Sequence, residues 1–393
     1  MYYHEFRGLS LSALGFGCMR LPTLPDHTID REQVFAMTDY ALSHGVNYFD
    51  TAYPYHESLS EVVVGEALRR HPREQWYLAT KYPGHQIAKS YDPAAVFEEQ
   101  LKKCGVEYFD FYLLHNVCES SLAAYLDPRW NIIGYFQEQK RLGRIRHLGF
   151  STHARPETLR QFLDLHGQDM EFCQIQLNYL DWTLQDAKAK VELLRERHIP
   201  IWVMEPVRGG RLVSLSGEEA APLHAACPGR TAAEWAFRFL QGIPEVTVTL
   251  SGMSSMQQMM ENIATFDACR PLTGEEQATL LATAERMKNA LPCTACRYCT
   301  HGCPMGLDIP MLIAAYNDAH FKQSNTVGMQ MDALPADKRP SACIGCGACA
   351  AICPQKIDIP AAMADLAAIL ERTPHWADIC KAREEAARRL RGE

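Results

Sequence analysis

The cysteines are the residues whose spacing most clearly indicates chemistry. The sequence of 393 residues contains 15 cysteines, and eight of them lie between positions 293 and 353. They form two runs of the pattern C-x2-C-x2-C-x3-C-P, each followed by Asp-Ile-Pro. Every matched position of the second run lies 50 residues after its counterpart in the first, so this segment is an internal duplication.

Two such runs predict two iron–sulfur clusters. Three thiolates at short intervals can hold three corners of a [4Fe–4S] cubane, and the fourth, before proline, ligates the other cluster in two-cluster proteins. One predicted set is Cys293, Cys296, Cys299 and Cys353, and the other is Cys343, Cys346, Cys349 and Cys303. Zinc, the alternative, usually has paired C-x2-C sequences without the third close cysteine. The segment resembles a bacterial-type two-cluster ferredoxin module of the helix-rich variety.

Four ionisable residues nearer the N-terminus form a second candidate site: Asp50, Tyr55, Lys81 and His115. Each lies at or just after the end of a short apolar segment. Lys81 follows Asp50 by 31 residues and precedes His115 by 34, about one strand–helix unit each time. An ammonium group lowers the pKa of a neighbouring tyrosine, which is otherwise about 10. We therefore expect the four side chains to meet and to transfer a proton to or from a carbonyl oxygen, with His115 orienting that oxygen.

Short apolar segments that alternate with helical stretches must position these residues. Eight segments read as buried strands: 14–18, 48–52, 76–80, 109–115, 147–151, 172–177, 201–205 and 246–250. Eight strand–helix units in about 250 residues match a closed (β/α)8 TIM barrel. An open doubly wound sheet is the alternative, but it usually opens its first helix with a Gly-rich turn, and here a loop follows Gly17.

We expect three parts in the α/β chain. Residues 1–270 form the barrel, residues 271–290 a linking helix, and residues 291–393 a small, mainly α-helical dicluster ferredoxin-like domain.

The barrel region resembles the aldo/keto reductase family over roughly residues 1–270. The shared motifs are Phe-Asp-Thr-Ala-Tyr-Pro-Tyr at 49–55, Ala-Thr-Lys at 79–81 and Leu-Leu-His-Asn at 113–116. This resemblance implies that Tyr55 is the general acid, that Asp50 and Lys81 tune it, and that His115 polarises the carbonyl. It also implies an NAD(P)H site, at the positions of Ser151, Thr152, Gln174, Met204, Glu261 and Asn262.

The sequence departs from the family pattern around this cofactor site. Thr152 stands where an asparagine normally follows the serine, and Met204 stands where an aromatic residue usually stacks on the nicotinamide. The positions that match the adenosine-phosphate clamp are Gly252, Met253 and Gln258. Without a cation there, a preference for NADPH is not expected. Arg208 and Arg211 either compensate or are solvated loop charges.

The composition is that of a soluble globular protein, and the net charge disfavours two classes of partner. Hydrophobic residues make up 47% and charged residues 22%, as in a soluble globular protein. The net charge of −8 disfavours nucleic acid or an anionic membrane as a partner. No apolar run is long enough for a membrane span, and the N-terminus lacks the layout of a signal peptide, so we expect a cytoplasmic protein. The alternating charges at 381–393 predict an exposed helix face.

The two candidate sites together predict an oxidoreductase with a small carbonyl or alcohol substrate. A hydride carries two electrons, whereas a cluster takes one at a time. Our leading hypothesis is that the clusters exchange electrons with a redox partner protein. One alternative is the same enzyme with purely structural clusters, and another is a non-catalytic electron-transfer or redox-sensing protein.

Overall fold

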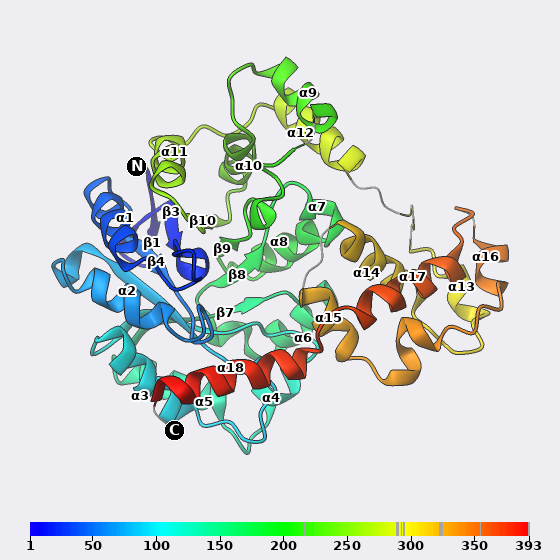
Figure 1. Ribbon diagram of the computed structural model, residues 1–393, viewed down its shortest axis with the longest axis horizontal. Coiled ribbons are helices and arrows are strands. Elements are labelled where there is room, and N and C mark those ends of the chain that lie inside the picture. The colour runs from blue at the N-terminus through cyan, green and yellow to red at the C-terminus, as the bar shows by residue number, and fades with distance from the viewer. Residues whose placement is uncertain are drawn as a thin grey trace.

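Eight parallel strands close into a barrel in the computed structural model, which describes residues 1–215, 217–287, 291, 293, 295–321, 325–353 and 355–391 (Figure 1). The strands are β3 (Leu14–Gly17), β4 (Tyr48–Asp50), β5 (Tyr77–Tyr82), β6 (Phe109–Leu114), β7 (Ile145–Thr152), β8 (Cys173–Gln176), β9 (Ile201–Met204) and β10 (Val246–Ser251). Each pairs with the next, and β10 pairs with β3. All eight predicted segments are strands, so the predicted barrel is confirmed.

Helices between the strands surround the barrel. They are α1 (Arg31–Ser43), α2 (Ser60–Leu68), α3 (Pro93–Cys104), α4 (Leu122–Leu126), α5 (Ile132–Arg141), α6 (Pro156–His166), α7 (Asp181–Leu184), α8 (Ala187–Glu196), α9 (Gly217–Ala226), α10 (Ala232–Gln241) and α11 (Met256–Thr265). Local sequence sets their ends. The Asp30 carboxylate accepts a hydrogen bond from the Gln33 backbone N–H (3.0 Å) at the start of α1. Gly105 takes a left-handed conformation (φ 64°) after α3.

An N-terminal hairpin, which the sequence analysis did not predict, closes one end of the barrel. Its strands are β1 (Tyr3–Phe6) and β2 (Leu9–Ser12). The Phe6 ring packs edge-on against Trp202 (5.1 Å between ring centroids) and lies 5.8 Å from Phe111. Because this end is filled by aromatic side chains, a ligand has access to the barrel at the opposite end, where the strands finish.

The helix α12 (Gly274–Met287) follows the barrel, within the predicted linking helix, whose residues 288–290 lie outside the described part of the chain. It packs against α9, and Leu280, Ala284 and Met287 join the core of the barrel. The domain boundaries at residues 270 and 290 stay a prediction.

The C-terminal domain is helical and repeats its own structure. Its helices are α13 (Tyr298–His301), α14 (Ile309–Phe321), α15 (Asn325–Asp332), α16 (Ala348–Ile352), α17 (Ile359–Glu371) and α18 (Trp376–Arg391). α14 and α17 start 50 residues apart and pack on each other. Within the described part of the chain, no helix has the length and apolarity that crossing a membrane would need.

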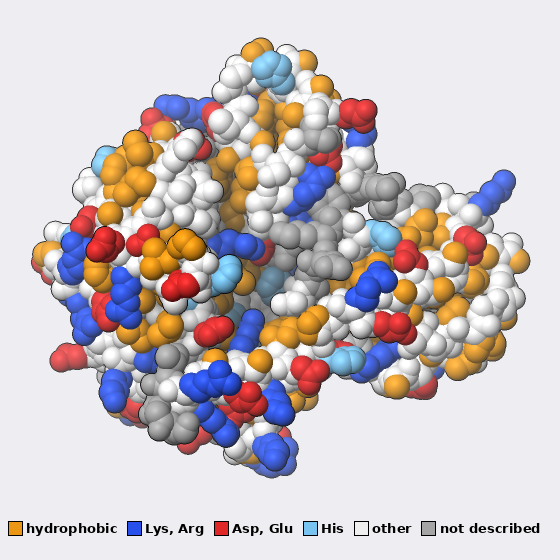
Figure 2. Space-filling view, viewed as in Figure 1, with side chains coloured by type: hydrophobic (Ala, Val, Ile, Leu, Met, Phe, Trp, Pro, Cys, Tyr) orange, Lys and Arg blue, Asp and Glu red, His pale blue; other side chains and the backbone are white. Residues whose placement is uncertain are grey.

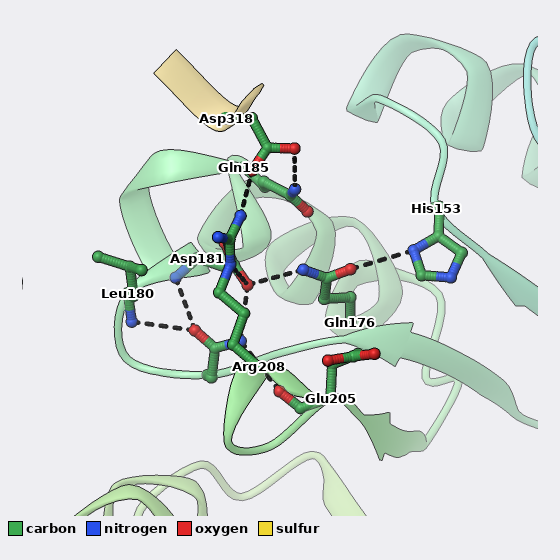
Figure 3. Close-up of polar contacts among 9 residues, drawn as sticks. His153, Gln176, Leu180, Asp181, Gln185, Glu205, Arg208 and Asp318 are labelled. Carbon is green, nitrogen blue, oxygen red and sulfur yellow. Dashed lines mark hydrogen bonds and ion pairs between the residues drawn. The ribbon is translucent and has the colours of Figure 1, made fainter. Parts of the chain in front are cut away.

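A buried ion-pair network joins this domain to the barrel (Figure 3). Arg208 follows β9, and its Nε lies 3.1 Å from an Asp181 carboxylate oxygen on α7. Its guanidinium also pairs with Asp318 on α14, which accepts a further hydrogen bond from the Gln185 amide (2.9 Å). Both charged partners are almost fully buried, at 5% exposure for Arg208 and 6% for Asp318.

The prediction of a solvated charge at Arg208 or Arg211 is therefore wrong for Arg208. Two carboxylates occupy its guanidinium, and it serves as a contact between domains rather than as a free cation for a cofactor phosphate. Arg211 donates to the Glu219 carboxylate (2.6 Å) and is partly exposed.

We expect Arg208→Met to loosen the docking of the C-terminal domain. The change leaves Asp181 and Asp318 buried beside each other without their ion-pair partner, and removing one partner of a buried pair costs about 3–5 kcal/mol. Hydrogen–deuterium exchange should accelerate in α14, and the unfolding midpoint in urea should fall. The matched control is Arg211→Met, which breaks a partly exposed pair and should cost less than about 1 kcal/mol. Equal exchange in α14 for both variants would contradict this role.

Candidate functional site

A buried ion pair lies at the mouth of the barrel where β4 and β5 end. The Lys81 ammonium donates to the Asp50 carboxylate (2.5 Å) and to the Thr51 carbonyl oxygen (2.8 Å). The Lys81 side chain is fully buried and Asp50 is 3% exposed. A buried charge is stable only when it is paired and hydrogen-bonded, so these contacts hold the ammonium in one position.

Tyr55 and His115 lie beside this pair. The Lys81 Nζ atom is 5.2 Å from the centre of the Tyr55 ring, and the Tyr55 and His115 rings meet edge-on at 5.9 Å. The structure thus brings Asp50, Tyr55, Lys81 and His115 together, as predicted; their catalytic roles stay a prediction.

The loop that carries Tyr55 has an unusual backbone. The next three residues, His56, Glu57 and Ser58, all have positive φ angles, of 49°, 54° and 71°. Left-handed conformations are unfavourable for such residues and rarely occur in succession. The His56 imidazole accepts a hydrogen bond from the Leu21 backbone N–H (3.1 Å), which ties this turn to the loop after β3. The strained residues therefore lie directly after Tyr55, whose ring lies beside Lys81 and His115.

Burial and neighbouring charges give the side chains of the site different protonation states. Burial lowers the pKa of Lys81, but the neighbouring acids Asp50 and Tyr55 outweigh this and raise it above its usual value, so Lys81 stays an ammonium. Burial raises the pKa of Tyr55, and the Lys81 charge opposes that rise. Burial lowers the pKa of His115 far below its usual value, and His85 and Lys81 add to the effect. Near neutral pH the site therefore holds a phenol, an ammonium and a neutral imidazole.

The predicted nicotinamide residues follow the neighbouring strand ends. Ser151 on β7 pairs in register with Gln174 on β8, and Met204 ends β9. The Gln174 Oε1 atom is buried and has no hydrogen-bond partner among the described residues, which fits a ligand that carries an N–H group. Asn262 on α11 donates to the Ser251 hydroxyl at the end of β10 (3.1 Å).

Two of the predicted cofactor residues have other partners. The Thr152 hydroxyl donates to the Val117 carbonyl oxygen (2.7 Å) and accepts from the Ala154 N–H (2.9 Å), so it braces its own loop. Glu261 is exposed on α11 and accepts from the Gln257 amide (2.8 Å).

The eight motif cysteines surround two hollows in the C-terminal domain. One hollow is lined by Cys303, Cys343, Cys346 and Cys349. The other is lined by Cys293, Cys296, Cys299 and Cys353. The structure groups the cysteines into the two crossed sets that the spacing predicted, while iron ligation by them stays a prediction. Ile309 and Ile359 line both hollows and lie between them.

The backbone around the two hollows is duplicated as well. Ala295 and Arg297 have left-handed φ angles of 53° and 64°, and their counterparts Gly345 and Gly347 have 67° and 76°. Turns of this kind direct successive N–H groups inward, as in anion-binding nests. The first repeat keeps the conformation without glycine, so the surrounding fold must enforce it.

Among the described residues, no three His, Cys, Asp or Glu side chains converge on one metal ion. A cubane cluster does not need such convergence, because each of its thiolates binds a different iron atom. Four cysteines spread around an apolar hollow are therefore a suitable donor set for a cluster.

Comparison with known proteins gives the relationships of both domains. A sequence model described as "Aldo/keto reductase family" matches residues 13–285, and one described as "4Fe-4S dicluster domain" matches residues 292–357. The chain belongs to the aldo/keto reductase family. Its family relationship makes it an oxidoreductase, and both resemblances seen in the sequence are confirmed.

Three similar proteins show how far the sequence identity and the coverage extend. The probable aldo-keto reductase 1 of Glycine max is 30% identical over 212 residues, which cover 52% of this chain and only 58% of that protein. The NADH-specific methylglyoxal reductase of Escherichia coli (strain K12) is 25% identical over 233 residues, or 54% of this chain and 69% of that protein. The structure of aldo-keto reductase AKR11C1 from Bacillus halodurans in its holo form matches with a TM-score of 0.60 and 27% identity, covering 72% of this chain and 96% of that one.

This aldo/keto reductase also has site residues that the sequence analysis missed. Asn116 takes a left-handed conformation (φ 53°), donates its N–H to the Ser151 hydroxyl (2.8 Å), and accepts at Oδ1 from the His153 N–H (3.1 Å). It thereby joins the loops after β6 and β7. The signal was its place directly after His115 in the Leu-Leu-His-Asn motif.

Histidines extend the site toward the C-terminal domain. The His85 ring, in the loop after β5, lies 4.2 Å from His115 and stacks at 5.6 Å on Trp376 of α18. His153 contacts the Gln176 amide oxygen (3.1 Å), and Gln176 in turn donates to Asp181 of the interdomain network (2.8 Å) (Figure 3). In the space-filling view, basic and histidine side chains gather around the hollow between the barrel and the C-terminal domain (Figure 2).

We expect the buried His85 and the partly buried His153 to make the fold sensitive to acid. Burial lowers the pKa of His85 to about 3 and that of His153 to about 4, from an ordinary value of about 6.5. As the pH falls from about 6.5 toward 4, the unfolded chain binds protons that the folded chain does not, so the free energy of unfolding decreases. His153→Gln should show a smaller loss of urea midpoint between pH 7 and pH 5 than the unaltered protein.

The exposed His224 provides the control for this measurement. His224→Gln should keep the full pH dependence, because that side chain is exposed in both states. The same slope in His153→Gln as in the unaltered protein would contradict the assignment.

Proposed function

We propose that the barrel interconverts a carbonyl compound and its alcohol, with Tyr55 as the general acid and base. The observation that carries this proposal is the buried Lys81–Asp50 pair beside the Tyr55 ring, with the neutral His115 ring edge-on to Tyr55. This arrangement offers a proton donor, a cation to stabilise its conjugate base and a second hydrogen-bond donor at one point.

Each residue has a distinct part in the proton transfer. In the reducing direction, the Tyr55 hydroxyl donates its proton to the carbonyl oxygen as that oxygen gains charge. The Lys81 ammonium stabilises the phenolate that remains, and Asp50 holds Lys81 in place. The neutral His115 donates a hydrogen bond to the same oxygen. In the oxidising direction, the phenolate of Tyr55 accepts the proton of the alcohol.

A nicotinamide dinucleotide is the cofactor that suits the neighbouring strand ends, and when bound it supplies the hydride. Ser151, Gln174 and Asn262 are the residues that would hold it, and the unpartnered Gln174 oxygen would accept from the carboxamide. Met253 is fully buried, and Gly252 and Gln258 carry no charge, so these positions do not favour a 2′-phosphate. The E. coli relative is named as NADH-specific, which agrees with a preference for NADH here.

The crossed cysteine sets would hold two [4Fe–4S] clusters that exchange electrons with a redox partner protein. The position of helix α14 supports a role of the clusters in electron transfer. Its Ile309 lines both hollows, and its Asp318 lies in the interdomain network. These residues are nine positions apart, about 14 Å along a helix. The alternative of structural clusters rests on a different observation, that six of the eight motif cysteines, all except the exposed Cys296 and Cys346, lie in or against the small apolar core of this domain.

The first test is Tyr55→Phe. Loss of the hydroxyl removes the proton donor, and general acid catalysis contributes about 10²–10⁴-fold to a rate. We expect kcat for aldehyde reduction to fall by about that factor, while NADH binding measured by fluorescence is retained. Tyr53→Phe is the matched control, because the Tyr53 hydroxyl two residues earlier bonds to Glu99 on α3 (3.0 Å) instead. Unchanged turnover in Tyr55→Phe would refute the assignment.

The second test addresses the clusters. We expect anaerobically purified protein to lose visible cluster absorbance when it is titrated with NADH, and to show reduced-cluster EPR signals. Cys353→Ser should lose about half of the bound iron, since it removes one ligand from the set of the first run. Cys269→Ser, at an exposed thiol outside the motifs, is the control. NADH binding without any cluster reduction would favour the structural alternative.

A further inference from the structure

The last helix of the C-terminal domain packs one face on the barrel. Trp376, Cys380, Arg383 and Ala387 recur at helical spacing on α18, and three of them are nearly fully buried, at 4%, 3% and 4% exposure for Trp376, Cys380 and Ala387. Trp376 and Cys380 share an apolar cluster with Cys118 and Ala154 of the barrel loops. The predicted exposed face at 381–393 is thus wrong for Arg383, which lies on the packed side.

A series of ring contacts leads from Arg383 to Tyr55. The Arg383 guanidinium carbon lies 5.1 Å from the centre of the Trp376 ring. The Trp376 indole N–H donates to the His85 carbonyl oxygen (3.1 Å), and the His85 ring lies 4.2 Å from His115. His115 in turn meets Tyr55. The guanidinium is therefore part of the group of side chains around the proposed proton donor.

The charge of Arg383 acts on this group. Its cation lowers the pKa of His85 and contributes to the low pKa of His115. Burial lowers the pKa of Arg383 itself, and the acidic groups that oppose this are Cys380 and Tyr55. Burial raises the pKa values of both of those groups, so neither is an anion near neutral pH.

Among the described residues no Asp or Glu forms an ion pair with Arg383, whose guanidinium instead lies over the Trp376 ring. Other arginines differ from it. Arg388, five residues further along the same helix, pairs with Glu384 (2.5 Å), and the buried Arg208 pairs with two aspartates. A half-buried cation without an anion costs free energy, which a ligand that carries negative charge would recover.

We propose that Arg383 binds an anionic group, a carboxylate or phosphate, on the carbonyl substrate. This inference rests on the proposed carbonyl chemistry at Tyr55. A guanidinium fork matches both oxyanions with two parallel hydrogen bonds. The substrate class is then an oxo acid or a phosphorylated carbonyl compound, and the domain that carries the cysteine hollows contributes to specificity in the barrel.

The test compares charged and neutral aldehydes of similar shape in the full-length, cluster-containing protein. The charged members are 4-carboxybenzaldehyde, 4-formylphenyl phosphate and succinic semialdehyde; their neutral counterparts, in the same order, are methyl 4-formylbenzoate, 4-methoxybenzaldehyde and butanal. The measured quantity is the ratio of kcat/KM for a charged aldehyde to that for its neutral counterpart. We expect Arg383→Gln to lower this ratio by about 10- to 100-fold, the range for loss of a charge-assisted hydrogen bond. Whichever charged aldehyde loses most identifies carboxylate or phosphate as the favoured group.

Two further variants separate binding from structure. Arg388→Gln, on the same helix, should keep the ratio of the unaltered protein. Arg383→Lys should restore part of it, because a point charge remains in place. A ratio that does not change in Arg383→Gln would overturn the proposal.

A binding measurement distinguishes this proposal from the proposed function. Calorimetric titration with 4-carboxybenzoate and with 4-formylphenyl phosphate needs no turnover. Weaker binding in Arg383→Gln supports the anion site even if no aldehyde is reduced, in which case only the carbonyl chemistry fails. Equal binding of both anions to Arg383→Gln and to the unaltered protein overturns the anion site even if Tyr55 is confirmed as the proton donor.

Discussion

Closure of eight parallel strands is the constraint on which the site depends. In a closed parallel barrel every strand finishes at the same mouth, so residues about 30 positions apart in the chain become neighbours there. The hairpin of β1 and β2 fills the opposite end with Phe6 and the aromatic residues around it. Asp50, Lys81 and His115 consequently meet on adjacent strands, and the buried ion pair between Asp50 and Lys81 holds the ammonium beside Tyr55.

The second domain is fastened to that mouth by two different kinds of contact. The pairing of Arg208 with Asp181 and Asp318 is ionic and buried, and it continues through Gln176 to His153. The contact made by α18 is mainly apolar and aromatic, with Trp376 stacked on His85. The candidate proton-transfer site and the domain with the cysteine hollows are therefore joined by packed side chains. The helix α14 runs from the cysteine hollows to the ionic contact.

The duplicated segment shows how a short motif specifies geometry. The positions 295, 297 and 306 and their counterparts 345, 347 and 356 all have positive φ angles, although the residues differ between the repeats. Gly345 and Gly347 adopt this backbone easily, whereas Ala295 and Arg297 adopt it at a cost. The crossed grouping of cysteines around each hollow requires both repeats to fold against each other, which α14 and α17 achieve by packing together.

The sequence by itself determined the barrel, the duplicated cysteine motif and the members of the proposed proton-transfer site. These features are local: apolar runs predict strands, fixed cysteine intervals predict a ligand pattern, and the interval from Asp50 to Lys81 matches one strand–helix unit. The sequence did not reveal the roles of Arg208, Trp376 and Arg383. Arg208 and its partner Asp181 are 27 residues apart in the chain, and Trp376 and its partner His85 are 291 residues apart. No local sequence pattern predicts which charges or rings will meet over such distances. Only the docking of the two domains decided this, because burial turns an ordinary loop arginine, Arg208, into an ion-pair anchor and places Arg383 over the Trp376 ring, with no carboxylate partner among the described residues.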